Sequence, residues 1–498
     1  MNFPRYSPFP SEWISFAIFF ALILGFIVIS ELVKKYFDWP VERSRKLVHV
    51  IVGIMISISP FLFTTALQPV VLAIIFIVIN TLALKSENFQ AMHATERKTF
   101  GTIYFPWAFL ILALFWWERP VTLITGTLLM TFADTLAATI GNTVKNPRVY
   151  RLWSDQKSLE GSAAMFIASY FIVLLTTLLL REYIFVYITT SQIFGLAGFM
   201  AIIATIAESN SKAGSDNFSV PVISAIAMDI YLVNFANDSI LLLIGWTLLS
   251  CLLFIAAIKF RSLTGSGGAG AFLIGILIFG AGGLKWIVPL LLFFTLSSLL
   301  SRIGGKNKFN NLINYQKSSR RDLLQVLANG GIAVIIAVIN FYNPSDWLYL
   351  IYLSAIAAAT ADTWATELGY FSKRNPRHIL TLKRVPKGTS GGISMIGTMG
   401  TILGALVIGL SGLFFGLTLS HAILIAFAGI FGSLIDSLLG GTIQARFHCP
   451  KCKAMTEQRI HCDGATKHFA GFHLIDNDAV NFICTLSGAV IILIIIGL

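Results

Sequence analysis

The chain has 498 residues, of which 56% are apolar and 12% are charged, which is about half the charged fraction of an ordinary soluble domain. This composition excludes a secreted module, a disordered chain and a large extramembrane enzyme domain. Lys and Arg (36) outnumber Asp and Glu (24), giving a net charge of +12; because the basic residues lie in short loops between apolar runs, they indicate a cytoplasmic membrane face and anionic ligands, not nucleic acid.

The first apolar run, residues 14–33, is long enough to span a bilayer and is followed by Lys34 and Lys35. It therefore predicts a membrane helix and not a cleavable targeting segment. Similar runs recur to the end of the chain and predict about 14 transmembrane helices at about 20 residues each. We expect an all-α polytopic protein in a bacterial-type plasma membrane, with its active sites at the cytoplasmic face.

A Gly- and Ser-rich break at residues 259–270 separates two apolar blocks of similar length. We place the boundary between domains 1–260 and 261–498 there. An Ala-Asp-Thr motif and a later acid-Ser pair recur in both blocks, at Asp134 and Glu208 and again at Asp362 and Asp436. The separation is 74 residues in both blocks, from 134 to 208 and from 362 to 436. The chain is therefore expected to fold as two parallel-repeat helical bundles.

Two further motifs recur in the same order. Lys157 opens the sequence Lys-Ser-Leu-Glu-Gly-Ser, and Lys387 opens Lys-Gly-Thr-Ser-Gly-Gly. An Asp-Asn pair follows at 216–217 in the first half and at 476–477 in the second. The loops between the first acid and the lysine of each half are basic, so the positive-inside rule places both loops in the cytosol.

Acidic residues at the ends of apolar spans are costly, at about 2.5–3.5 kcal/mol each on insertion scales. Four such acids at matched spacing therefore predict a function. Carboxylates that hold Mg²⁺, a lysine beside phosphate oxygens and a glycine-rich turn together suit phosphoryl transfer. No Walker A motif is present, since Gly304-Gly305-Lys306-Asn307 lacks its spacing and its Ser or Thr. For the glycines, helix capping or close helix packing is the alternative interpretation.

The first half resembles the dolichol kinase and phytol kinase family over about residues 40–230. The motifs that carry this resemblance are RKLVHV at 45–50, ADTLAATIG at 133–141, KSLEGS at 157–162 and GSDNFSVP at 214–221. The resemblance implies a CTP-dependent lipid-alcohol kinase with its CTP site in the region from Asp134 to Gly161.

The second half, from about residue 263 to the C-terminus, is similar to the family of the plant phytyl-phosphate kinase, once called domain of unknown function 92. Its motifs are QVLANGG at 325–331, ADTWATELG at 361–369, VPKGTSGGIS at 385–394, DSLLGG at 436–441 and NDAVNF at 477–482. This resemblance implies a second phosphorylation. One chain would then convert a prenyl alcohol to its monophosphate and diphosphate, with CTP, Mg²⁺ and membrane lipid substrates.

Site residues are expected in both halves. Catalytic roles are expected for His49, Asp134, Lys157, Glu160, Glu208, Asp362, Lys387 and Asp436. Nucleotide or phosphate binding is expected for Arg45, Lys46, Ser158, Gly161, Asn217, Arg321, Gly388, Ser390, Gly391, Gly392 and Asn477. Mg²⁺ ligands are expected among Asp134, Glu208, Asp216, Asp362, Asp436 and Asp476.

His49 and its counterpart Gln325 differ in a way that fits the two substrates. An attacking alcohol must lose a proton, which His49 could accept at neutral pH. Gln325 cannot act as a base, but a monophosphate already carries an anionic oxygen and needs none. The alternative is that His49 anchors the end of a span or binds phosphate.

A polar loop at about residues 442–473 is found in the second half only. Cys449 and Cys452 have the C-x₂-C spacing that brings two thiolates to one metal ion. With Cys462 and one histidine they predict a structural Zn²⁺ site, and a reduced, metal-free loop is the alternative. The candidate histidines are His448, His461, His468 and His473; His461, beside Cys462, is placed in the expected ligand set.

Two other functions compete with the kinase. CDP-lipid synthases (cytidylyltransferases) resemble the first half in its Asp-Thr, Lys-x-x-Glu-Gly and Glu-Ser elements. Such synthases then carry Lys-Arg and Lys-Asp pairs with a Pro-Gly-His-Gly-Gly run, where this chain has Ser-Lys-Ala-Gly at 211–214. That departure favours a kinase. A polytopic transporter of a lipid or anionic solute is the other alternative, but the basic cytosolic loops favour a nucleotide.

Overall fold

The computed structural model describes residues 3–6, 9–85, 100–153, 155–309, 320–462 and 464–497. Within these residues, 14 helices are long and apolar enough to cross a membrane. The prediction of an all-α polytopic membrane protein with about 14 spans is confirmed. Several helix starts carry local capping signals: the Ser158 side chain accepts a hydrogen bond at the start of one helix, and Thr189 and Gln192 form a capping box at the next.

The chain divides into two compact units, Met1–Ile244 and Gly245–Leu498. The division falls inside helix α11 (Ile240–Lys259), upstream of the Gly- and Ser-rich break in the sequence.

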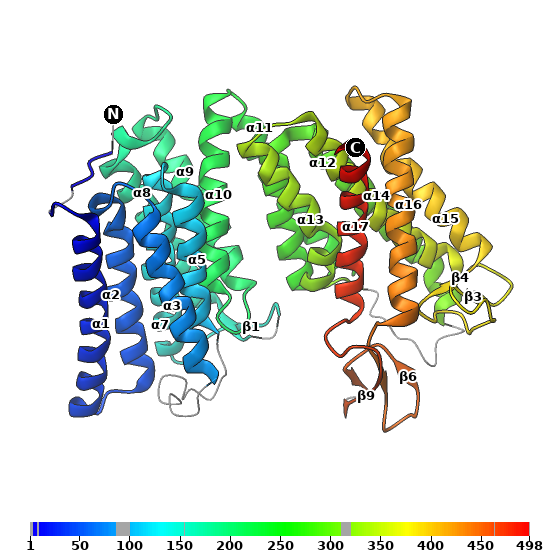
Figure 1. The fold of residues 1–498 in the computed structure, drawn as a ribbon, viewed down its shortest axis with the longest axis horizontal. Helices are drawn as coiled ribbons and strands as arrows, with labels where there is room; N and C mark the ends of the chain where they lie inside the picture. The colour runs from blue at the N-terminus through cyan, green and yellow to red at the C-terminus, as the bar shows by residue number, and fades with distance from the viewer. Residues whose placement is uncertain are drawn as a thin grey trace. The chain divides into compact units, whose positions relative to one another are not determined.

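In unit 1 most helices run alongside one another as a bundle (Figure 1). Its elements are α1 (Glu12–Phe37), α2 (Val41–Leu62), α3 (Leu67–Lys85), α5 (Gly101–Trp116), α6 (Pro120–Leu128), η2 (Leu129–Asp134), α7 (Thr135–Thr143), β1 (Val149–Tyr150), β2 (Lys157–Ser158), α8 (Leu159–Leu179), η3 (Arg181–Tyr183), α9 (Thr190–Ser209) and α10 (Asp216–Ala236). The span formed by α6, η2 and α7 packs against α2, α8 and α10. Its buried side chains join a core that includes Leu112, Leu123 and Met130.

Unit 2 is built around α14, which packs against α12, α13, α15, α16 and α17. Its helical elements are α12 (Gly265–Phe309), α13 (Leu323–Tyr342), α14 (Asp346–Gly369), α15 (Met395–Ser411), η4 (Gly412–Phe415), α16 (Leu419–Thr442) and α17 (Asn477–Gly497). Small residues such as Gly404, Gly429 and Gly488 lie directly against the α14 backbone, and this close approach lets several helices share one partner.

Short strands lie outside the helices of unit 2. A hairpin of β3 (Arg377–His378) and β4 (Gly392–Ile393) precedes α15. Beyond the ends of α16 and α17, a small β region forms a sheet with the order β6-β5-β9 and a β7-β8 hairpin (Figure 1). Its strands are β5 (Arg446–His448), β6 (Met455–Thr456), β7 (Ile460–His461), β8 (Gly464–Ala465) and β9 (Lys467–Ala470).

The helix that follows each hairpin starts in the same way in both units. Ser158 caps α8 by accepting a hydrogen bond from Gly161 N at 3.1 Å, and Ser394 caps α15 by accepting one from Gly397 N at 3.1 Å. A Cβ added at Gly161 would lie 3.5 Å from the Cα of Gly141, and one added at Gly397 would lie 3.7 Å from the Cα of Gly369.

This local structure makes Ser394 the counterpart of Ser158. The residue before the cap is Lys157 in unit 1 and Ile393 in unit 2. The sequence aligns Lys157 with Lys387, but the structure aligns Lys157 with Ile393. Lys387 lies in the turn before β4.

Candidate active site

Three carboxylates of unit 1, carried by three different spans, lie close together. Asp134 lies inside the span Pro120–Thr143, whereas the sequence predicted a position at the end of a span. Asp134 ends η2, Glu208 lies in the last turn of α9 and Asp216 begins α10. One oxygen from each lies within 4.8 Å of the others. Carboxylate oxygens are the ligands that Mg²⁺ prefers, so the donor set fits the expected cation.

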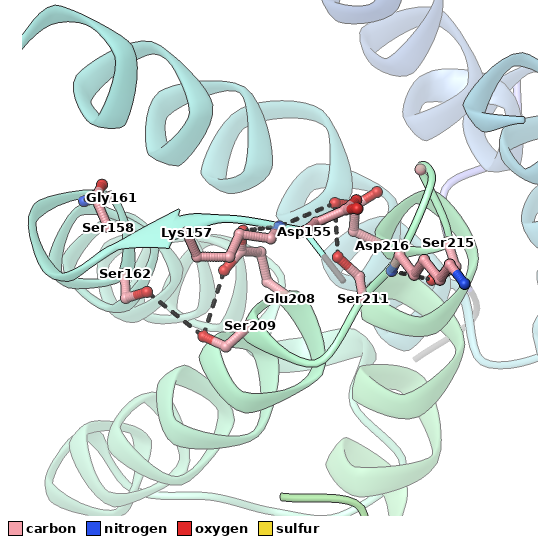
Figure 2. Close-up of polar contacts among 12 residues, drawn as sticks. Asp155, Lys157, Ser158, Gly161, Ser162, Glu208, Ser209, Ser211, Ser215 and Asp216 are labelled. Atoms are coloured by element: carbon pink, nitrogen blue, oxygen red, sulfur yellow. Dashed lines mark hydrogen bonds and ion pairs between the residues drawn. The ribbon is translucent and has the colours of Figure 1, made fainter. Parts of the chain in front are cut away.

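Lys157 projects from β2 into this group (Figure 2). Its Nζ forms an ion pair with Glu208 and a second one with Asp216 Oδ2 at 3.3 Å. Burial lowers the pKa of the Lys157 ammonium, but the Glu208 and Asp216 carboxylates outweigh that effect and raise the pKa above its usual value. Lys157 therefore stays charged at neutral pH.

The helix that delivers Asp134 contains a π-helical segment, η2, between α6 and α7. Such segments are rare and are frequently found at functional sites. The carbonyl oxygen of Met130, within η2, lies 3.2 Å from Nε2 of His49. The His49 ring also packs edge-on against Phe105, with centroids 4.8 Å apart, and Asp216 is close enough to act on it electrostatically. A His49 tautomer that donates from Nε2 leaves Nδ1 as an acceptor.

A hydroxyl network that the sequence did not reveal supports the carboxylates. The Tyr150 hydroxyl lies 2.6 Å from Ser162 Oγ and donates to Ser209 Oγ at 2.8 Å, next to Glu208. Ser211 Oγ donates to Asp216 Oδ2 at 3.0 Å (Figure 2). The pairing of β1 with β2 places Tyr150 opposite Lys157. Only this register could have indicated Tyr150, because its partners lie far along the chain.

Other predicted residues of unit 1 have structural partners. Glu160 accepts a hydrogen bond from Arg148 N at 3.0 Å and pairs with Arg148 Nε at 3.5 Å, so it holds the preceding loop and is not among the clustered carboxylates. Ser158 caps α8 and Gly161 packs closely against Gly141, a contact of the kind that the alternative interpretation of the glycines describes. The phosphate-binding roles of both residues stay predictions. The catalytic role of Glu160 stays a prediction.

The basic and amide residues near the site also have contacts. Arg45 lies in α2, and Lys46 Nζ lies 3.4 Å from both Glu42 Oε1 and Thr139 Oγ1. Asn217 donates from Nδ2 to Gly214 O at 3.2 Å. The phosphate-binding roles of Arg45, Lys46 and Asn217 stay predictions.

The acids of unit 2 are arranged differently. Asp362 of α14 and Asp436 of α16 both lie near enough to the Cys484 thiol of α17 to act on it electrostatically. Asp476 accepts a hydrogen bond from Ala479 N at 3.1 Å at the start of α17, and it pairs with Arg459 at 3.7 Å. Among the residues that the structure describes, these three acids do not form a clustered carboxylate group like that of unit 1.

The glycine-rich turn of unit 2, residues 387–392, lies against the end of α16. Gly388 and Gly391 have φ values of +83° and +78°, a conformation that favours glycine. A Cβ added at Gly391 would lie 2.5 Å from the Cα of Gly441 and 2.9 Å from the carbonyl oxygen of Ser437, the residue after Asp436. The backbone of the turn therefore lies close to the end of α16 that carries Asp436. In unit 1 the Lys157 side chain lies beside Glu208, the acid that corresponds to Asp436.

The remaining predicted residues of unit 2 lie in several different elements. Gly392 lies in β4, Ser390 Oγ donates to Glu457, and Asn477 begins α17. Arg321 stacks over the Phe293 ring at 5.6 Å, and its backbone pairs with that of residues 262–264. The phosphate-binding roles of these residues stay predictions.

The polar loop at about residues 442–473, called the Cys/His loop below, holds four metal-ligand candidates. Cys449, Cys452, His461 and Cys462 offer ligand atoms within 4.8 Å of one another. His461 Nδ1 lies 3.5 Å from Cys452 Sγ and 3.2 Å from Cys462 Sγ. The backbone N–H of Cys452 lowers the pKa of the Cys449 thiol to about 6. Three sulfurs and one imidazole form a donor set that suits Zn²⁺, and His461 is the histidine that the structure brings to the cysteines.

A comparison with protein families identifies the family of the second half of the chain. The family described as Integral membrane protein DUF92 matches residues 248–489. An uncharacterized membrane protein of Methanocaldococcus jannaschii is 37% identical over 40% of this chain and 82% of its own length. Protein PGR of Arabidopsis thaliana is 32% identical over 49% of this chain and 92% of its own length.

A more distant relative, the phytol kinase of Synechocystis, is 26% identical over 43% of this chain and 90% of its own length. No solved structure matches the chain. The predicted resemblance to these families is confirmed, and the chain belongs to the DUF92 family of integral membrane proteins.

Proposed function

We propose that unit 1 phosphorylates a prenyl alcohol in the membrane, with a nucleotide, CTP, as the donor. The observation that carries this proposal is the Lys157 ammonium held between Glu208 and Asp216, with Asp134 beside them. The similarity to a phytol kinase supports a prenyl alcohol as the acceptor. Glu208 and Asp216 lie at the ends of their spans, so this part of the site suits a substrate whose hydroxyl lies at the membrane surface and whose chain lies in the lipid.

Asp134, Glu208 and Asp216 would hold Mg²⁺, which supplies positive charge to the transferring phosphoryl group. Lys157 presents its ammonium beside the same carboxylates and neutralises phosphate oxygens. Arg148 and Arg151, in the loop before Lys157, add positive charge where a nucleotide would approach.

In this proposal His49 accepts the proton of the alcohol. Its Nε2 is anchored on the Met130 carbonyl, so Nδ1 is the acceptor. In the proposed reaction the alcohol oxygen forms a bond to the γ-phosphorus and the bond from that phosphorus to the nucleoside diphosphate breaks. The proton passes to His49 Nδ1, and prenyl monophosphate and CDP leave.

For unit 2 we propose the second phosphorylation, from prenyl monophosphate to diphosphate. The repeated acids Asp362 and Asp436 and the basic loop at 373–387 support this proposal. Gln325 in place of His49 fits a substrate that is already anionic. Since Ile393 occupies the place of Lys157, the cation of this site would come from Lys387 in the glycine-rich turn.

The test uses purified protein in lipid vesicles with Mg²⁺, CTP or ATP, and prenyl alcohols and monophosphates of several chain lengths. Mass spectrometry of the products is expected to show prenyl phosphates and CDP. Pyrophosphate with a CDP-lipid would instead identify a cytidylyltransferase, and solute flux without nucleotide consumption would identify a transporter.

Matched variants assign each step to a unit. Asp134→Asn should stop alcohol phosphorylation and leave the monophosphate reaction running. Asp362→Asn should leave alcohol consumption unchanged while monophosphate accumulates. If either substitution stops both reactions in a folded protein, the two-site proposal is wrong.

A further inference from the structure

The segment between the two pairs of metal-ligand candidates reaches the glycine-rich turn of unit 2. Cys449 and Cys452 precede β6, while His461 and Cys462 end β7 and begin the next turn. Residues 457–459 connect β6 to β7. Cys449 and Cys452 therefore lie on one side of this segment along the chain, and His461 and Cys462 lie on the other.

This connecting segment contacts two residues that the repeat predicts as site residues. Glu457 accepts a hydrogen bond from Ser390 of the glycine-rich turn, 67 residues earlier in the chain. Arg459 forms an ion pair with Asp476 at 3.7 Å and donates to the carbonyl oxygen of His473 at 3.0 Å. The segment therefore joins the glycine-rich turn and the start of α17 to the Cys/His loop.

The backbone around the cluster is strained in a way that a bound ion would offset. Lys453, directly after Cys452, has φ +59°, and Cys462 has φ +50°. These left-handed conformations cost about 1 kcal/mol or more for a residue with a Cβ. Both turns aim sulfurs at a common point, where His461 Nδ1 also lies.

We propose that Cys449, Cys452, His461 and Cys462 bind one structural Zn²⁺, and that this zinc centre holds Glu457 and Arg459 against Ser390 and Asp476. Zinc occupancy then controls the order of the glycine-rich turn. The donor set of three thiolates and one imidazole leaves no open position on a tetrahedral ion, so the centre supports structure and does not activate water. An effect of zinc on catalysis would depend on the proposed second phosphorylation. The ordering of the glycine-rich turn by zinc does not depend on it.

The first test is the zinc content of the purified full-length protein, measured by elemental analysis without chelators. About one Zn²⁺ per chain is expected, falling at least about tenfold in Cys452→Ser. Two controls separate this site from other metal-binding groups: Cys251→Ser in α11, and His468→Ala in β9, whose ring packs against His473. Both controls should keep their zinc. Absence of zinc in the wild type, or its loss in His468→Ala, overturns the site.

Cobalt substitution provides a second readout. Co²⁺ exchanged into the wild type should show sulfur-to-metal charge transfer and tetrahedral ligand-field bands, which Cys452→Ser should lose. Bands typical of six oxygen or nitrogen ligands would contradict a site with three thiolates.

Hydrogen exchange at residues 388–392 and 476–480 tests whether the zinc centre orders the glycine-rich turn and the start of α17. In the wild type, zinc removal is expected to speed amide exchange in both segments by at least about tenfold, because both lose a tethered partner. The double variant Glu457→Ala and Arg459→Ala should keep its zinc but show the same faster exchange. If this variant exchanges like the wild type, the zinc centre does not order the turn.

The two proposals can fail separately. A protein with zinc and the expected exchange behaviour but no activity on prenyl monophosphate would refute the second kinase and leave the zinc centre standing. A protein that makes diphosphate but contains no zinc would refute the zinc centre and support the second kinase.

Discussion

Replacing Lys157 by Met tests the candidate active site most directly, since methionine keeps the length of the side chain and removes the charge. The Lys157 side chain is 17% exposed and faces two carboxylates that are less exposed still. At the 3.3 Å distance to Asp216, an effective dielectric of about 20 gives an attraction of about 5 kcal/mol before desolvation is counted. Removing one partner of a buried pair typically costs about 3–5 kcal/mol of stability.

The effect on catalysis is expected to be of similar size. Loss of one preorganised group that stabilises transition-state charge costs about 10²–10³ in rate, or about 3–4 kcal/mol. The assay measures kcat/KM for prenyl alcohol by mass spectrometry at saturating Mg²⁺ and nucleotide. Lys34→Met is the matched control, because Lys34 is 19% exposed and pairs with Glu31 at the end of α1, away from the carboxylates. The control should keep its rate within about twofold.

The pH dependence of stability gives an independent check. Because the folded-state pKa of Lys157 is raised, its stabilising effect is complete below the unfolded value of about 10.4 and is lost only as pH rises through the higher folded value. The stability difference between the wild type and Lys157→Met should therefore stay constant from about pH 7 to pH 9. A folded Lys157→Met protein with more than a third of the wild-type kcat/KM would refute the assignment.

Three other substitutions test the cation ligands of unit 1, the proposed base His49 and the glycine-rich turn of unit 2. Asp216→Asn should raise the Mg²⁺ concentration for half-maximal alcohol phosphorylation by about tenfold or more, measured by Mg²⁺ titration. His49→Gln should slow the alcohol reaction by about 10²–10⁴ and leave the monophosphate reaction unchanged, measured on both substrates. Gly391→Ala should lower the unfolding midpoint in detergent far more than Gly416→Ala. Both glycines have positive φ, but an added Cβ is 2.5 Å from Gly441 Cα at Gly391 and has open space at Gly416.

Each of these has a result that contradicts it. An unchanged Mg²⁺ requirement in Asp216→Asn would remove that carboxylate from the cation site. A wild-type alcohol rate in His49→Gln would show that the histidine is an anchor and not a base. Equal unfolding midpoints for Gly391→Ala and Gly416→Ala would mean that the turn yields without strain.

Several site features depend on contacts that sequence motifs do not encode. Lys157 and Lys387 both open a short motif after a basic loop, so the sequence alignment pairs them. The serine caps and glycine contacts of the two helices instead pair Lys157 with Ile393. Glu160 shares a motif with Lys157 but contacts Arg148, because the first turn of α8 points its side chain at the preceding loop.

Composition and the lengths of the apolar runs are enough to predict the membrane architecture, and the acids and lysine of the first half are enough to suggest phosphoryl transfer. Span number follows from composition and length alone, because a bilayer requires about 20 apolar residues for each helix. Burying ionisable groups is costly, so acids in or beside apolar runs indicate function, and the cysteine spacing indicates one metal ion. Which of these groups lie together depends on how the helices pack. The tertiary structure brought Asp134, Glu208, Asp216 and Lys157 together in unit 1 and left the acids of unit 2 in different surroundings. It also joined Ser390 to Glu457, because contacts between residues far apart in the chain depend on how helices and loops pack and not on local sequence pattern.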